Sequence, residues 1–87
     1  MVRVKLFANF REIAGVSEVE VDARSIRDVL TKLCEAFPGL KDAFFEGDEL
    51  KDYVHIMVNG RHVRGNLDFE IKDDDVVAVF PPVSGGR

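Results

Sequence analysis

One amphipathic helix constrains the fold of this 87-residue chain more than any other feature. Apolar side chains recur at the three- and four-residue spacing that places them on a single helix face. They are Ile26, Val29, Leu30, Leu33, Cys34 and Phe37. Ser25, followed three residues later by Asp28, predicts a capped start, and Pro38-Gly39 predicts the end. Because strand patterns stand on both sides of it in the sequence, this helix must lie across one face of a sheet.

Alternation of apolar and polar residues predicts five strands around the helix. We expect them at 2–7, 17–22, 54–58, 61–63 and 76–80. Asn59-Gly60 predicts a type I′ hairpin turn between the third and fourth, because both positions of that turn need a positive φ. The sheet is therefore built from two hairpins and one long final strand.

Three segments are predicted as connections. The stretch 9–15 is too short for an independent helix and is interpreted as a wide turn, with or without one helical turn, ended by Gly15. The stretch 40–52 is expected to be an irregular crossing segment with one or two aromatic residues packed under the helix. The stretch 64–72 is expected to be a loop anchored by a few apolar side chains.

This order of elements predicts an α+β fold of the β-grasp (ubiquitin-like) type. The apolar strand 76–80 suits a central place in the sheet, beside the first strand and parallel to it. The sheet is then mixed, with four to five strands wrapped round one main helix. We expect residues 1–81 to form this single domain and residues 82–87 to form a flexible C-terminal Gly-Gly tail.

The composition limits the setting and the partners. A chain with 46% hydrophobic and 32% charged residues is typical of a soluble globular domain, and its net charge of −4 argues against a nucleic-acid partner. No run approaches the roughly 20 apolar residues of a membrane span. The chain opens directly into a strand pattern, so we expect neither a signal peptide nor a membrane partner. The single cysteine cannot form an internal disulfide, which fits a reducing, cytoplasmic setting.

The end of the chain carries the clearest functional signal. It reads Phe80-Pro81-Pro82-Val83-Ser84-Gly85-Gly86-Arg87. Two prolines remove backbone donors, so the sheet cannot continue through them and the chain leaves it extended. Gly85 and Gly86 carry no side chain and can pass through a narrow channel to a reacting group. We therefore interpret this end as a substrate tail whose reactive group is a carboxylate at or near the terminus.

Three segments resemble a known family. Residues 6–15 are similar to the opening signature of the small sulfur-carrier subunit of molybdopterin synthase, the MoaD family. The turn at 58–60 and the run 79–86, with the acidic turn between them, resemble its second half in order and spacing. The likeness covers nearly the whole chain. The thiamine sulfur carriers (ThiS) share the fold and the Gly-Gly end but usually lack the Phe-Pro-Pro run, and small archaeal modifier proteins resemble the chain equally well.

The resemblance implies a carrier of molybdenum cofactor biosynthesis that is not an enzyme on its own and binds no cofactor. A partner adenylating enzyme would use ATP to convert the Gly86 carboxylate to an acyl-adenylate, and sulfide would then displace AMP to leave a thiocarboxylate. In a complex with the larger subunit of molybdopterin synthase, that sulfur passes to precursor Z. In a modifier, a lysine of a target protein would attack instead and form an isopeptide bond.

Arg87 departs from the family pattern, in which the mature chain ends at the second glycine. The departure implies one of three situations: a protease trims Arg87, the residue is an addition to the natural chain, or this copy is not activated as it stands.

Parity predicts a docking surface on the sheet face away from the helix. Phe7, Met57 and Phe80 should point to that face, and apolar groups with no helix over them are typical of a partner-binding patch. The alternative is that the loop at 40–52 or the loop at 64–72 folds over them.

We expect the partner-binding surface to include the tail and one basic residue. Its predicted members are Phe7, Met57, Phe80, Pro81, Pro82, Val83, Ser84 and Arg11, with Gly85 beside the reactive Gly86. Arg11 would pair with an acidic group of a partner at the rim, although a single exposed arginine is more often simply solvated.

Other residue types that carry chemistry have simpler explanations. His55 and His62 have no thiol or histidine at ligand spacing, so we expect no zinc site. The acidic run 73–75 is interpreted as a solvated turn, and Cys34 as a small core residue rather than a nucleophile. No metal ligand is therefore predicted.

Overall fold

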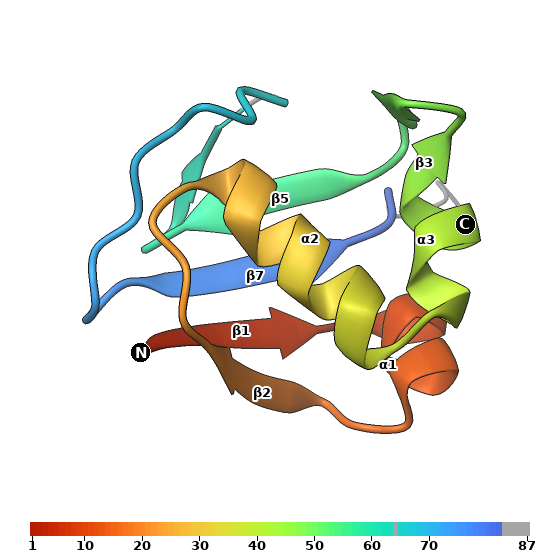
Figure 1. Ribbon diagram of the computed structural model, residues 1–87, viewed down its shortest axis with the longest axis horizontal. Coiled ribbons are helices and arrows are strands. Elements are labelled where there is room, and N and C mark those ends of the chain that lie inside the picture. Colours follow the sequence, from red (N-terminus) through yellow and green to blue (C-terminus); the bar gives the residue numbers. More distant parts are fainter. Residues whose placement is uncertain (64, 83–87) are drawn as a thin grey trace.

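The computed structural model describes residues 1–63 and 65–82, which form a five-stranded mixed sheet with the longest helix lying across one face (Figure 1). The elements are β1 Val2–Leu6, α1 Ala8–Ala14, β2 Glu18–Val21, α2 Ile26–Ala36, α3 Gly39–Phe44, β3 Phe45–Glu46, β4 Glu49–Leu50, β5 His55–Val58, β6 Arg61–His62 and β7 Val76–Phe80. The order in the sheet is β2-β1-β7-β5-β6, and β1 runs parallel to β7. The predicted β-grasp arrangement, with the last strand central and parallel to the first, is confirmed.

The core lies between α2 and one face of the sheet. Alternate residues of β1 and β7 are buried there, as the period of two requires. They are Val2, Val4, Leu6, Val77 and Val79. They share one cluster with the buried residues of α2, which are Ile26, Val29, Leu30 and Leu33. Each such side chain contributes about 1.5–3 kcal/mol by leaving water, so this layer supplies most of the driving force for folding.

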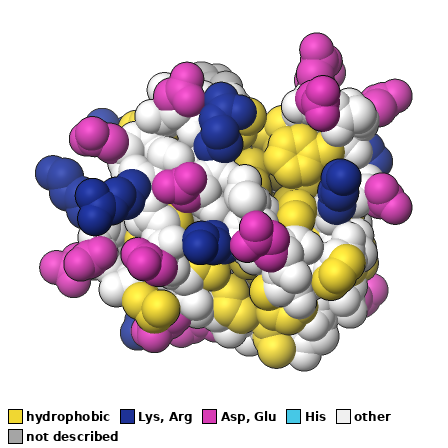
Figure 2. Space-filling view, in the orientation of Figure 1, with side chains coloured by type: hydrophobic (Ala, Val, Ile, Leu, Met, Phe, Trp, Pro, Cys, Tyr) yellow, Lys and Arg dark blue, Asp and Glu magenta, His cyan; other side chains and the backbone are white. Residues whose placement is uncertain are grey.

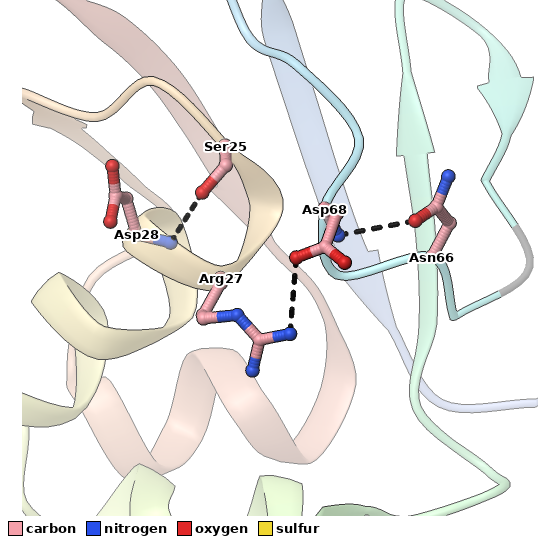
Figure 3. Close-up of polar contacts among 5 residues, drawn as sticks. All are labelled: Ser25, Arg27, Asp28, Asn66 and Asp68. Carbon is pink, nitrogen blue, oxygen red and sulfur yellow. Dashed lines mark hydrogen bonds and ion pairs between the residues drawn. The ribbon is translucent and has the colours of Figure 1, made fainter.

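The start of α2 is capped as the sequence predicts. Oγ of Ser25 accepts a hydrogen bond from the backbone N–H of Asp28 at 3.1 Å (Figure 3). The Asp28 carboxylate reaches back to the N–H of Arg24 at 3.2 Å, one residue before the cap, and not to the N–H of the cap itself. The bond to Ser25 satisfies a donor of the first turn that has no acceptor within the helix.

A loop after β6 completes this helix start. The N–H groups of Ile26 and Arg27 donate to carbonyl oxygens of that loop at 3.0 and 2.8 Å. The Arg27 guanidinium also contacts the Asp68 carboxylate at 3.2 Å, and the N–H of Asp68 donates to the Asn66 side chain (Figure 3). Ile71, at the end of the loop, is buried, which confirms the prediction of an apolar anchor.

Two segments that were predicted as connections contain helices. The wide turn expected over 9–15 is α1, which ends at Gly15 with a φ of 80°. The irregular segment expected over 40–52 holds α3 and the β3–β4 hairpin. Both helices are too short to persist alone, but Phe10 and Phe44 are fully buried against each other with ring centroids 5.0 Å apart. Tertiary packing therefore stabilises helices that their own length does not.

The Asn59-Gly60 turn has the predicted geometry, with φ values of 52° and 85°. The Asn59 side chain also forms hydrogen bonds at the start of β7. It donates to the Asp75 carboxylate and accepts from the N–H of Val76, both at 2.9 Å. These bonds join the β5–β6 hairpin to the start of the central strand.

Charges of both signs are scattered over the side of the molecule that carries α2, with hydrophobic side chains exposed between and below them (Figure 2). Figure 2 shows Lys and Arg side chains interspersed with Asp and Glu there, with acidic groups gathered over the β3–β4 corner. Among the residues described, every helix is too short or too polar to cross a lipid bilayer.

Candidate functional site

An apolar groove of about 450 Å³ opens on the sheet face opposite α2, at the end of β7. Its lining is Phe7, Ala8, Met57, Ala78, Phe80, Pro81 and Pro82. Two strands, β5 and β7, supply Met57, Ala78 and Phe80, and the other lining residues lie in the chain that follows β1 and in the chain that follows β7. A hollow of this kind accommodates an apolar surface or side chain of another protein better than a polar ligand.

Strand register positions the groove. Ala78 of β7 lies opposite Met57 of β5, and both point away from α2 because their neighbours Val77 and Val79 point toward it. Phe7 follows β1 directly, and its N–H donates to the carbonyl of Val79 at 3.3 Å, which extends the β1–β7 pairing by one residue. Its ring meets that of Phe80 edge to face, with centroids 6.4 Å apart.

The predicted open-face residues do lie together. Phe7, Met57 and Phe80 line one groove, and Pro81 and Pro82 extend it where the chain leaves the sheet. Neither 40–52 nor the described part of 64–72 contributes to the lining, so the alternative of a covering loop is not supported. Phe7 remains 41% exposed. The role of these residues in binding stays a prediction.

The remaining predicted residues lie apart from the groove lining. Arg11 is exposed on α1, one turn after Ala8, and is not among the groove residues. The predicted partner-binding residues Val83 and Ser84 and the predicted reactive end, Gly85, Gly86 and Arg87, lie outside the described residues.

Two features of this face were missed in the sequence. Ala8 lines the groove with a φ of 52°, a left-handed conformation that costs a residue with a Cβ atom about 1–2 kcal/mol. No sequence signal marks that conformation at an alanine. His55 stacks on the Phe80 ring, with centroids 5.6 Å apart and an angle of 20° between the rings. Parity could have found His55, because it shares the open face with Met57.

The two histidines are in contact, although their spacing in the sequence does not indicate it. His55 Nδ1 and His62 Nε2 lie 3.0 Å apart, because the β5–β6 hairpin brings the two rings together across the sheet. Their separation of seven positions in the sequence hides this contact. Within the described ranges, there is no group of three or more His, Cys, Asp or Glu side chains placed to hold a metal ion.

Other ionisable groups fit structural roles. Burial raises the pKa of the Cys34 thiol, although Lys41 nearby opposes the shift. The thiol is therefore protonated near neutral pH and a weak nucleophile, which fits the predicted role of a small apolar residue. On β1, Arg3 pairs with Glu18 of β2 at 3.0 Å, and neither residue lines the groove. The groove itself is almost entirely apolar.

A mixed sheet wrapped round one main helix, with an apolar groove where the chain leaves the last strand, defines a ubiquitin-like β-grasp protein. Sequence comparison then places it within that class. The family model of the ThiS family matches residues 4–86, and the chain belongs to this family.

Three known proteins illustrate the likeness. The chain is 34% identical to small archaeal modifier protein 3 of Haloferax volcanii, with 98% of each chain covered. It is 33% identical to the molybdopterin synthase sulfur carrier subunit of Chlamydomonas reinhardtii, again over 98% of each. Among solved structures, small archaeal modifier protein 1 of Methanosarcina acetivorans superposes with a TM-score of 0.87 at 41% identity, covering 98% of this chain and 95% of that one. The chain is therefore a member of a family of small sulfur carriers and ubiquitin-like modifiers.

Proposed function

We propose that this chain is the sulfur carrier subunit of a molybdopterin synthase and receives its sulfur at the carboxylate of Gly86. The observation that carries the proposal is the apolar groove at the point where Pro81 and Pro82 lead the chain off the sheet toward Gly85-Gly86. Two findings support it: membership of the ThiS family and 33% sequence identity to the molybdopterin synthase sulfur carrier subunit of Chlamydomonas reinhardtii.

The chemistry follows from the poor reactivity of a carboxylate. A carboxylate oxygen of Gly86 attacks the α-phosphorus of ATP in a partner adenylating enzyme, and pyrophosphate leaves. Sulfide then attacks the carbonyl carbon of the acyl-adenylate, and AMP leaves with the electrons of the broken C–O bond. The product is a thiocarboxylate, whose sulfur is delivered to precursor Z in a complex with the larger subunit. The partner enzyme uses the ATP, and this chain needs no cofactor of its own.

The groove sets the geometry for that partner. Phe7, Met57 and Phe80 would dock on an apolar surface of the adenylating enzyme and fix the body while the tail enters the active site. The four residues from Val83 to Gly86 can span at most about 14 Å beyond Pro82. The ATP site of the partner must therefore lie within that distance of the surface that occupies the groove.

The first experiment is mass spectrometry of the protein from its native cell. We expect Arg87 to be absent and Gly86 to carry sulfur in place of one oxygen. An intact Arg87 end on every molecule, in cells that are making molybdenum cofactor, would contradict the proposal. A chain ending at Gly86, incubated with ATP and a competent adenylating enzyme, should also exchange labelled pyrophosphate into ATP.

A second function, protein modification, is favoured by one observation. The chain is 34% and 38% identical to small archaeal modifier proteins 3 and 1 of Haloferax volcanii, against 33% for the molybdopterin carrier subunit. In that role a lysine amine attacks the activated Gly86 carbonyl, and AMP or a thiol leaves as the isopeptide bond forms. Gly-Gly remnants on lysines of other proteins, lost when Gly86 is deleted, would establish it. A Gly86 thiocarboxylate with no such remnants would leave only the carrier.

A further inference from the structure

The two histidines beside the groove form a second chemical feature that the carrier chemistry does not use. His55 Nδ1 and His62 Nε2 are 3.0 Å apart, and the rings are inclined at 73°. A neutral imidazole has one donor and one acceptor nitrogen, so the two rings share one proton at this contact. We propose that this pair binds a divalent transition-metal ion of the kind that imidazole prefers, Zn²⁺, Ni²⁺ or Cu²⁺.

The spacing of the two nitrogens suits an ion in place of the proton, which moves to the other nitrogen of the ring that carries it and leaves both facing nitrogens as lone-pair donors. Imidazole nitrogens lie about 2.0–2.1 Å from zinc, so two of them at angles of 90–110° stand about 2.9–3.4 Å apart. The observed 3.0 Å falls in that interval. Pairing of Met57 with His62 fixes the strand positions, so only ring rotation is needed to direct both nitrogens at one ion.

The surroundings favour a cation. His55 and His62 line a hollow of about 620 Å³ together with Asp48, Glu49, Lys51 and Asp52, among other residues. Three carboxylates against one ammonium give this wall a net charge of −2. Figure 2 shows acidic groups gathered over the neighbouring β3–β4 corner. Such a wall raises the local concentration of cations without itself supplying ligands.

The site is a two-imidazole site whose other positions are water. No group of three protein ligands exists among the described residues, so the ion exchanges readily. His55 stacks on Phe80, and Phe80 lines the groove. An ion that holds the His55 ring in one orientation therefore also restricts the Phe80 ring and couples the metal site to the groove. The proposal stands independently of which function the tail serves.

Calorimetric titration of NiCl₂ into the full chain, prepared without a histidine tag, tests the site. We expect one ion per chain and a rise in Tm with nickel, as for any ligand of the folded state. His55→Phe keeps a ring on Phe80 but removes the nitrogen, and His62→Gln keeps a hydrogen-bonding group. Each should weaken nickel binding at least about tenfold, the lower end of what loss of a ligand's supporting partner costs. Thermal unfolding without metal checks that both variants fold.

Two outcomes would overturn the proposal. One is unchanged nickel affinity in either folded variant, or no nickel heat from the native chain up to millimolar concentration. The other concerns the triple variant Asp48→Asn, Glu49→Gln, Asp52→Asn. The proposal predicts that this variant weakens nickel binding less than either histidine variant does, because the carboxylates act at a distance. If it abolishes binding while the histidine variants keep it, the ion is held by carboxylates and not by the pair.

Discussion

The two faces of β7 carry equally apolar side chains in very different surroundings. Val77 and Val79 are fully buried beneath α2, whereas Ala78 and Phe80 line an open groove on the other side of the same strand. The strand is the same, and so is the pairing with β1 and β5. The difference lies in what covers each face.

That contrast separates residues that stabilise the fold from residues that are available to a partner. Each side chain under α2 contributes about 1.5–3 kcal/mol by burial, and its loss also leaves a cavity. Phe7 on the other face keeps 41% of its surface in water and so contributes much less. An aromatic residue in that position is better explained by binding than by folding.

The largest expected effect comes from two phenylalanines three positions apart. Phe10→Ala should lower the free energy of unfolding by about 3–5 kcal/mol, because the fully buried ring packs on Phe44 and its removal leaves a cavity. Phe7→Ala should cost at most about 1 kcal/mol, since its ring is partly exposed and contacts mainly Phe80. Urea denaturation of both variants measures the difference. Equal losses would break the distinction between the two faces.

The next largest effect is on binding. Phe80→Glu should weaken activation by the proposed adenylating enzyme at least about tenfold, or about 1.4 kcal/mol, because a charge enters an apolar groove that has to be desolvated. Its unfolding free energy should fall by much less than that of Phe10→Ala, because the Phe80 ring is only partly buried and no helix covers it. Pyrophosphate exchange and urea denaturation measure the two quantities.

Val76→Glu is the matched control for that variant. It places the same carboxylate on the same strand and face but outside the groove lining. It should leave activation nearly unchanged. A large loss of stability in Phe80→Glu, or equal loss of activation in both variants, would show that the groove is not the docking surface.

The sequence predicts features that depend on local periodicity or on a single turn. Parity alone assigns Phe7, Met57 and Phe80 to one face, and Asn59-Gly60 predicts its turn because few other residues accept a positive φ. The cap at Ser25 follows from its spacing to Asp28 in the same way. In each case neighbouring positions in the chain hold the whole signal.

Features that depend on distant partners could not be predicted. Helices α1 and α3 exist because Phe10 and Phe44 meet, and neither short segment contains that information. The contact between His55 and His62 needs the exact register of the β5–β6 hairpin, which a turn motif alone does not give. The groove follows parity, but its closure by Ala8 needs a strained backbone that no residue type signals.

A smaller effect is expected at the start of α2, on the covered face. Ser25→Ala should lower the free energy of unfolding by about 1 kcal/mol, because the N–H of Asp28 loses its acceptor. Activation by the proposed adenylating enzyme should not change, since Ser25 caps α2, which covers the other face of the sheet, and is not among the groove residues. Ser25→Asp, which retains an acceptor oxygen, is the matched control and should keep most of the stability. A drop in activation without loss of stability would contradict the division between the faces.

The smallest effect concerns Asp75, which directly precedes the first residue of β7, at the end of the strand away from the groove. The backbone N–H of Lys72 and then the Asn59 amide hold the pKa of the Asp75 carboxyl below its usual range. A lowered folded-state pKa means that the carboxylate stabilises the fold at pH values above the unfolded pKa of about 3.9, and that this contribution disappears as the pH falls through the folded value. The unfolding free energy of the native chain should therefore decline more steeply on acidification than that of Asp75→Asn. Urea denaturation at several acidic pH values measures the unfolding free energy of both proteins. The same pH dependence in both would show that the Asp75 carboxylate does not stabilise the start of β7. Because this carboxylate lies outside the groove lining, pyrophosphate exchange near neutral pH should be the same in both proteins.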